Sequence, residues 1–180
     1  MVKLISVVVA IVPALWILLH LLQAVRASLQ EHRPFVVGHR GAAGLAPENT
    51  LPAIDAGIQH GVHAIEVDVH RTRDGKLVVM HDTSVERTTQ SSGEIRDMTW
   101  DQIRQLDAGR HFAPSYAGTF VPTLSQVIER VLGAGCTLIV EVKDPALYPG
   151  IAQDLADLFA DRVPSVGDDV VVISFDVEWL

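Results

Sequence analysis

Four short groups of ionisable residues in this sequence could together do chemistry. They are His39-Arg40, Glu66-x-Asp68, His81-Asp82 and Glu141-x-Lys143. The carboxylates at 66, 68 and 141 offer hard oxygen ligands, which suit a divalent cation such as Mg²⁺ or Ca²⁺. Two of them are only two residues apart and would repel each other on one face of a strand unless a cation lay between them. We therefore predict that the metal ligands are Glu66, Asp68 and Glu141.

The other residues of these groups suit the handling of protons and phosphate. An imidazole titrates near neutral pH, so His39 and His81 are candidates for a general acid and a general base, in either order. Arg40 and Lys143 are cations that could hold a phosphoryl group. A divalent cation, two imidazoles and two positive side chains make up a site suited to the hydrolysis of a phosphodiester.

Strands are predicted to position these groups. Four apolar runs each end at or contain one group: residues 35–37, Ala64–His70, Leu77–Met80 and Thr137–Val142. The first run predicts a buried strand, and the alternation in the second places Glu66 and Asp68 on one face. Active sites of parallel α/β sheets and barrels form at the carboxyl ends of the strands. We therefore expect four successive strands to bring the site together.

Helices are predicted between the strands. One opens at Asn49-Thr50 and stops at Gly61, and another follows Thr123, which forms a capping box with Gln126. A third helix is predicted over Ile151–Phe159 and a last strand over Val170–Ile173. Strands that alternate with helices predict an α/β fold with a mainly parallel sheet.

The connection between Asp68 and Leu77 leaves two alternatives open. Asp74-Gly75 is a turn signal, which favours a hairpin between the two strands. A parallel barrel would instead need a return crossover, and the few residues available would have to cross in an extended form.

An ordered set of motifs resembles the glycerophosphodiester phosphodiesterase family. The motifs are His39-Arg40-Gly41, Ala46-Pro47-Glu48-Asn49-Thr50, Glu66-Val67-Asp68-Val69, Thr72-Arg73-Asp74-Gly75-Lys76, His81-Asp82, Arg87-Thr88-Thr89 and Glu141-Val142-Lys143. Each motif is short enough to arise by chance, whereas their order and spacing across residues 36–143 are specific.

This resemblance implies a (β/α)8 TIM barrel that hydrolyses glycerophosphodiesters to glycerol 3-phosphate and an alcohol with a divalent cation. Residues 83–118 would correspond to the insertion that shapes substrate access in the family. The matching residues are His39 and His81 for the acid/base pair, Glu66, Asp68 and Glu141 for the metal ligands, and Arg40 and Lys143 for phosphate binding.

The N-terminal segment predicts a membrane anchor. Residues 4–25 read LISVVVAIVPALWILLHLLQAV, without Asp, Glu, Lys or Arg. A helix of that length rises about 33 Å, enough to cross a hydrocarbon core of about 30 Å. We predict a single-pass transmembrane helix within residues 1–26 and a linker at 27–34. A cleaved signal peptide is the alternative, and the positive-inside rule leaves the side of the membrane undecided.

Residues 35–180 are predicted to be the phosphodiesterase domain, incomplete at its C-terminal end. The sequence from Val170 to Asp176 resembles the family's fifth strand and the Ser-Phe-Asp that follows it. Three further strand–helix units are expected by analogy, so only about the first five strands would be present. An open barrel exposes two sheet edges and much of its core, and we therefore expect residues 35–180 not to fold stably alone.

Other interpretations of these residues remain. The formal net charge of −8 and the lack of a basic stripe argue against nucleic acid as a partner. Glu66 and Asp68 could form the solvent face of an edge strand, and Glu48-Asn49-Thr50 is predicted to be a helix cap. Two rival functions are lysophospholipase D-type hydrolysis of membrane lysolipids and a non-catalytic, membrane-tethered role.

Overall fold

The computed structural model describes residues 16–23, 25, 34–163 and 169–179. The chain divides into two compact units, Met1–Phe35 and Val36–Leu180. In the first unit, residues 16–23 and 25 are helical. Every helix within the described residues is too short or too polar to cross a bilayer. Most of the predicted anchor at 1–26 and of the linker at 27–34 lies outside the described residues, so both stay predictions.

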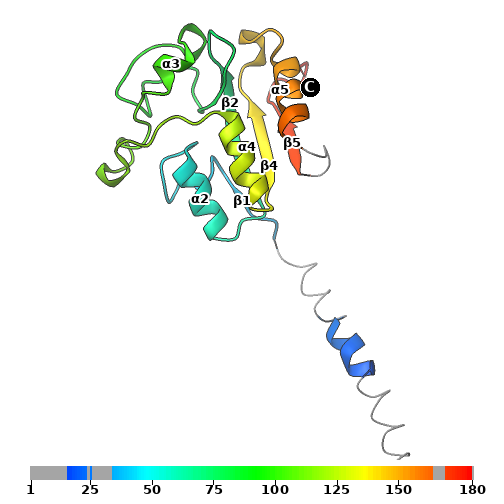
Figure 1. The fold of residues 1–180 in the computed structure, drawn as a ribbon. Helices are drawn as coiled ribbons and strands as arrows, with labels where there is room; N and C mark the ends of the chain where they lie inside the picture. The colour runs from blue at the N-terminus through cyan, green and yellow to red at the C-terminus, as the bar shows by residue number, and fades with distance from the viewer. Residues whose placement is uncertain (1–15, 24, 26–33, 164–168, 180) are drawn as a thin grey trace, which may run out of the picture. The chain divides into compact units, whose positions relative to one another are not determined.

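The second unit is built on a sheet whose main strands are parallel (Figure 1). Its order is β1-β2-β4-β5, and the bounds are β1 Val37–Gly38, β2 Ala64–Arg71, β4 Thr137–Val142 and β5 Val170–Ile173. In the register of β2 and β4, Asp68 lies beside Glu141. The predicted α/β fold with a parallel sheet is confirmed, and β4 and β5 have the predicted bounds.

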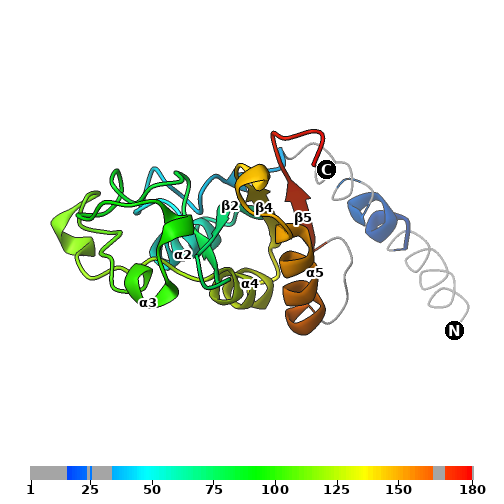
Figure 2. The same cartoon turned by 90° about the horizontal axis from the view of Figure 1, so that it is seen from above.

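Three helices form one layer on one face of this sheet (Figure 2). They are α2 (Leu51–Gln59), α4 (Leu124–Gly133) and α5 (Ile151–Arg162). The odd-numbered residues of β2, Ile65, Val67 and Val69, pack against them in the main hydrophobic core. Because side chains alternate along a strand, Glu66 and Asp68 face the opposite side of the sheet.

The sequence signals for helix α4 are confirmed. Thr123 and Gln126 form the predicted capping box, in which Gln126 Oε1 accepts a hydrogen bond from the Thr123 amide at 2.9 Å. The predicted apolar stripe is fully buried and consists of Leu124, Val127, Ile128 and Val131. This packing fixes the start of α4 after the long segment that precedes it.

Strand β3 (Leu77–Val79) forms a hairpin with β2, so the first of the two alternatives is correct. The two strands are antiparallel, with Val69 beside Val79 and Arg71 beside Leu77. Gly75 has a φ of +85°, which suits the turn between them. The described residues therefore contain four parallel strands and one antiparallel strand, and the extended crossover of the second alternative is not formed.

Residues 83–120 form a small layer of their own. It contains the 3-10 turns η1 (Ile95–Asp97) and η2 (Pro114–Tyr116) and the short helix α3 (Trp100–Ile103). A second hydrophobic cluster holds it to the hairpin, and its buried members are Val78, Met80, Val85, Ile95, Ile103, Ala108 and Val121. The outer face of β3 is thus covered by the predicted insertion.

Both edge strands of the main sheet are partly exposed. Val36 and Val37 at β1 are 44% and 40% exposed, which corrects the prediction of a buried first strand. At the other edge, Val171 and Ile173 of β5 are 43% and 37% exposed, whereas Val170 and Val172 pack on the core. The central strands β2 and β4, which carry the acidic residues, are more buried than these edges.

Candidate functional site

Glu66, Asp68 and Glu141 meet at the centre of the sheet. Each offers a carboxylate oxygen, and these oxygens lie within 4.8 Å of one another. All three residues are buried, and Asp68 is 0% exposed. Because β2 is a central strand, the alternative of a solvent-facing edge strand is wrong. The structure thus brings together all three predicted metal ligands.

Two oxygens of this cluster have no hydrogen-bond partner among the described residues. They are Glu66 Oε1 and Asp68 Oδ1. Burial raises the pKa of Glu66 to about 7, with the Arg40 amide opposing and the charges of Asp68 and Glu141 adding to the rise. Buried carboxylate oxygens without partners are costly unless they ligate a cation. The donor set therefore fits a hard divalent cation.

The loop after β1 carries His39 and Arg40 into this site. The Arg40 amide donates a hydrogen bond to Glu66 Oε2 at 2.8 Å, and His39 Nε2 lies 3.9 Å from the same oxygen. Gly41 makes this approach feasible, because its φ is +85° and an added Cβ would meet the Ala53 backbone at 2.7 Å. His39 remains exposed, with 68% of its side chain accessible.

Two cations flank the acidic cluster, as predicted. Lys143 Nζ donates a hydrogen bond to Glu141 Oε1 at 2.6 Å and lies 3.2 Å from Asp68 Oδ1, at a geometry that makes an ion pair without a hydrogen bond. Arg40 Nε lies 3.5 Å from Asp68 Oδ2. Burial lowers the pKa of Lys143, but its bonds to the two carboxylates outweigh this and raise it. Lys143 is therefore charged at neutral pH.

Asn49 belongs to the site, although it was predicted to be part of a helix cap. Its Nδ2 donates to Asp68 Oδ2 at 2.8 Å, and its Oδ1 accepts from the Asp68 amide at 3.2 Å. It is 3% exposed and has a φ of +58°. Together with Arg40 and Asp144 it is one of three described non-glycine residues with positive φ, and all three lie at this site. Backbone strain of this kind gathers at functional sites.

His81 reaches the site because the hairpin turns back. Met80, its neighbour, donates its amide hydrogen to the Asp68 carbonyl at 3.0 Å. His81 Nδ1 lies 2.6 Å from Asp82 Oδ1. Strand β3 runs antiparallel to β2, so its carboxyl end lies beside Val69 of β2. His81 follows that end and therefore lies near the acidic residues of β2.

A buried histidine, His70, contacts the backbone of His81. His70 Nε2 lies 3.1 Å from the His81 carbonyl oxygen, and His70 Nδ1 lies 2.9 Å from the Tyr148 hydroxyl. Because a carbonyl only accepts, Nε2 of His70 donates and Nδ1 accepts from Tyr148. Burial lowers the pKa of His70 and raises that of Tyr148 to about 12, so both are neutral at pH 7. The sequence pattern does not indicate these polar contacts of His70.

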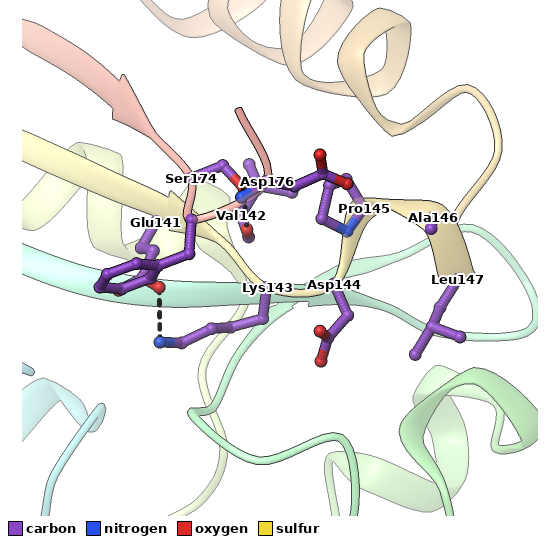
Figure 3. Close-up of a pocket in the computed structure, with 10 residues that line it drawn as sticks. Glu141, Val142, Lys143, Asp144, Pro145, Ala146, Leu147, Ser174 and Asp176 are labelled. Atoms are coloured by element: carbon purple, nitrogen blue, oxygen red, sulfur yellow. Dashed lines mark hydrogen bonds and ion pairs between the residues drawn. The ribbon is translucent and has the colours of Figure 1, made fainter. Parts of the chain in front are cut away.

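A pocket of about 550 Å³ opens beside Lys143. Its walls come from the end of β4, with Glu141, and from the loops after β4 and β5, with Asp144, Ser174 and Asp176 (Figure 3). The Phe175 ring also lines it, 89% exposed, with Lys143 Nζ 5.7 Å from the ring centroid. A substrate bound at the acidic cluster could therefore extend into a pocket with aromatic and acidic walls.

The fold and the site together define a class. A buried carboxylate triad lies at a parallel α/β sheet, with an arginine and a lysine beside it and histidines close by. This arrangement is that of α/β proteins with a metal site able to bind an anionic group such as phosphate.

Comparison with known proteins specifies the family. Residues 39–180 match the glycerophosphoryl diester phosphodiesterase family. The chain is 37% identical over 145 residues to a glycerophosphodiester phosphodiesterase of Caldanaerobacter subterraneus, covering 80% of this chain. It is 38% identical over 135 residues to the Bacillus subtilis enzyme of the same name, covering 71% of this chain. The chain belongs to the glycerophosphoryl diester phosphodiesterase family.

Solved structures agree with this assignment. An Oleispira antarctica phosphodiesterase in complex with the product sn-glycerol-3-phosphate matches with a TM-score of 0.75 and 32% identity over 80% of this chain and 58% of that one. A glycerophosphodiester phosphodiesterase of Agrobacterium tumefaciens matches with a TM-score of 0.68 and 36% identity, over 81% and 60%. The chain spans 59% and 46% of the lengths of the two curated relatives above.

Proposed function

We propose that the protein hydrolyses glycerophosphodiesters to glycerol 3-phosphate and an alcohol, with a divalent cation as cofactor. The observation that carries this proposal is the buried triad of Glu66, Asp68 and Glu141, in which two oxygens accept no hydrogen bond from the described residues and two cations lie close by. The names of the relatives and the product bound to the Oleispira antarctica phosphodiesterase support it.

The residues divide the work by their chemistry. Arg40 and Lys143 would hold the phosphoryl oxygens and offset the charge that develops during hydrolysis. His39 and His81 would exchange protons with the attacking and leaving oxygens. Glu66, Asp68 and Glu141 would hold Mg²⁺ or Ca²⁺, which supplies Lewis-acid polarisation of a phosphoryl oxygen or activation of a hydroxyl nucleophile.

Turnover of glycerophosphocholine with and without EDTA tests this function. We expect release of choline and glycerol 3-phosphate, its loss with EDTA, and its recovery with Mg²⁺ or Ca²⁺. His81→Ala should lower kcat by roughly 10²- to 10⁴-fold, the usual contribution of an acid/base residue. His111→Ala serves as the control, because His111 is exposed. Undiminished turnover in His81→Ala would refute the histidine assignment.

Membrane lysolipids are the second candidate substrates. The apolar run at residues 4–25 favours them, because an anchor would hold the site close to a bilayer. We propose that this run is a single-pass membrane helix. The protein should then stay in the membrane fraction after extraction at alkaline pH, and protease protection of vesicles would report the side that carries residues 35–180.

A substrate panel separates the candidate functions. Soluble diesters such as glycerophosphocholine are compared with lysophosphatidylcholine in vesicles. Faster turnover of the lysolipid would favour a lysophospholipase D-type activity. Cation binding by calorimetry without turnover of either substrate would favour the non-catalytic, membrane-tethered role.

The finer fold assignment is likewise a proposal. The sheet β1-β2-β4-β5 with its outer layer of helices would form part of a (β/α)8 barrel, with Glu66, Asp68 and Glu141 facing the interior. The matches to solved relatives over about four fifths of this chain support it. An experimental structure in which β1 and β5 stay unpaired edges in the intact protein would contradict it.

A further inference from the structure

A network of charged side chains joins the phosphate-binding end of the site to His81. Arg40 Nη1 donates to Glu48 Oε1 at 3.0 Å. Arg87 donates to both oxygens of Glu48, at 2.6 and 3.0 Å, and to both oxygens of Asp82, at 2.6 and 3.2 Å. Asp82 Oδ1 in turn lies 2.6 Å from His81 Nδ1. The Arg87 guanidinium thus binds two carboxylates at once, each through two hydrogen bonds.

We propose that Glu48, Asp82 and Arg87 are positioning residues that fix His81 and Arg40 relative to each other. This inference rests on the proposed function, because it assigns to the network a part in diester hydrolysis. Glu48 lies in the loop after β1, whereas Asp82 and Arg87 follow β3. The network therefore joins two segments that carry different parts of the site.

The network determines which nitrogen of His81 can exchange a proton. Hydrogen bonds from Arg87 lower the pKa of Asp82 to about 2 against the opposing effect of burial, and His81 adds to the lowering. Asp82 is therefore an anion at neutral pH and can only accept. His81 Nδ1 must carry the hydrogen of this bond, which leaves Nε2 as the nitrogen available to exchange a proton. Asp82 thus sets both the tautomer and the rotation of the ring.

Arg87 also balances the charge of the network. Burial works to raise the pKa of Glu48, but the hydrogen bonds and charges of Arg87 and Arg40 lower it below its ordinary value. Cations and anions alternate along this network of ion pairs, in the order Arg40, Glu48, Arg87, Asp82. Without Arg87, Arg40 would be the sole described cation bound to Glu48, and Glu48 would lose the contact that fixes its orientation toward Arg40.

The surroundings of Arg87 argue against a role limited to stabilising the fold. Its side chain is 46% exposed, and exposed ion pairs contribute little to stability. The local backbone has its own support, because the Thr89 amide and hydroxyl both bond the Val85 carbonyl, at 3.1 and 2.7 Å. Loss of the Arg87 side chain should therefore leave this segment folded while it frees Asp82 and Glu48.

Steady-state kinetics on glycerophosphocholine separate the two ends of the network. Asp82→Asn should lower kcat by about 10- to 100-fold, the cost of a reacting group displaced by about 1 Å, with KM nearly unchanged. Glu48→Gln should raise KM by about tenfold, the equivalent of one charge-assisted hydrogen bond to Arg40. Arg87→Met should change both constants. Arg87→Lys should recover only part of the loss, because an ammonium group keeps the charge but cannot bind both carboxylates in fork geometry.

The matched control is Arg104→Met. Arg104 also donates through Nε to an aspartate, Asp101, at 2.8 Å, and is 55% exposed, but it has no link to the site. Binding of Mg²⁺ or Ca²⁺ by calorimetry should be the same in Arg87→Met as in the parent, because the side-chain bonds of Arg87 within the described residues go to Glu48 and Asp82. Kinetic constants for Arg87→Met that match those of Arg104→Met would overturn the proposal.

A measurement without substrate keeps this inference separate from the proposed function. The ¹⁵N spectrum of the histidine side chains, recorded at a pH at which the His81 ring is neutral, should show the tautomer with hydrogen on Nδ1. Asp82→Ala should shift it toward a mixture of tautomers, and Arg87→Met should change its signal while Arg104→Met does not. An inactive parent protein with this Arg87-dependent spectrum would refute the proposed function and support the positioning. A His81 signal that is the same in Arg87→Met and the parent would refute the positioning, whatever the activity.

Discussion

Glu66 makes the stability of the cation-free protein depend on pH in a direction opposite to that of most carboxylates. Its folded-state pKa is about 7, raised chiefly by burial, against an ordinary value of 4.5. A group with a raised pKa binds its proton more tightly in the folded state. Its contribution to stability is therefore complete below pH 4.5 and is lost as the pH rises through 7. Glu66→Gln, which keeps the size of the side chain and removes the charge, should abolish this loss.

The size of the effect follows from the separation of the two pKa values. At about 1.4 kcal/mol per pH unit, the separation corresponds to a free energy of unfolding lower by about 3 kcal/mol at pH 8 than at pH 4.5. The Glu66 side chain is 9% exposed, so solvent screens little of this. For a domain of this size such a change moves Tm by roughly 6–12 °C.

Thermal unfolding followed by circular dichroism, in EDTA at pH 4.5 to 8, measures the effect. Other groups titrate in this range in both proteins, so the relevant quantity is the Tm of Glu66→Gln minus that of the parent. This difference should grow from near zero at pH 4.5 to its full size at pH 8. Glu129→Gln, at an exposed glutamate, should show no such trend.

The bound cation provides a second check on the same reasoning. Because a carboxylate must lose its proton to ligate, Mg²⁺ or Ca²⁺ should raise the parent Tm more at pH 8 than at pH 5. A Tm difference between Glu66→Gln and the parent that is the same at both pH values would refute the argument. An equal cation effect at pH 5 and pH 8 would do so as well.

Three further substitutions test the support of the site and of the fold. Asn49→Ala removes both hydrogen bonds to Asp68 and should weaken cation binding by about 10- to 100-fold in calorimetry, as for other groups that orient metal ligands. Tyr148→Phe leaves His70 Nδ1 without its donor and should lower the free energy of unfolding by about 1–3 kcal/mol in urea titrations. Thr123→Ala removes a helix cap and should cost about 1 kcal/mol in the same titrations, without an effect on cation binding.

The sequence predicts the acidic cluster well because the relevant signals are local and periodic. Alternation in β2 placed Glu66 and Asp68 on one face, and the parallel pairing of β2 with β4 puts Glu141 beside Asp68. The apolar face of each strand and the capping box of α4 were equally local. The alternation and the capping box depend on residues within a few positions of one another, so one sequence suffices to predict them. The pairing that puts Glu141 beside Asp68 joins distant segments, and it was expected because the carboxyl ends of parallel strands meet at one edge of the sheet.

The residues that were missed depend on contacts between distant segments. His70 contacts Tyr148, 78 positions away, and Arg87 contacts Glu48, 39 positions away. Neither pair has a spacing or a period that the sequence could reveal. The motif Glu48-Asn49-Thr50 did stand out, but a helix start explained it equally well, and only the coordinates show that Asn49 bonds Asp68.

The hairpin explains how a short connection can still deliver a histidine to the site. A parallel strand after Asp68 would need a crossover, yet few residues separate it from Leu77. The chain instead extends β2 to Arg71, turns at Gly75, and returns until the Met80 amide meets the Asp68 carbonyl. His81 is then the next residue. Its distance from the cluster is therefore set by the length of the hairpin.

The candidate site depends on four strands of the sheet, β1 to β4. The loop after β1 supplies His39 and Arg40, the hairpin of β2 and β3 supplies two carboxylates and His81, and β4 supplies the last carboxylate and the lysine. Strand β5 adds only a pocket wall, through residues 174–176. Cation binding and the position of His81 should therefore respond little to changes at Phe175. The preference for one alcohol group of the substrate over another should change most with such substitutions. Phe175→Ala should therefore change KM by different factors for diesters with different alcohol groups.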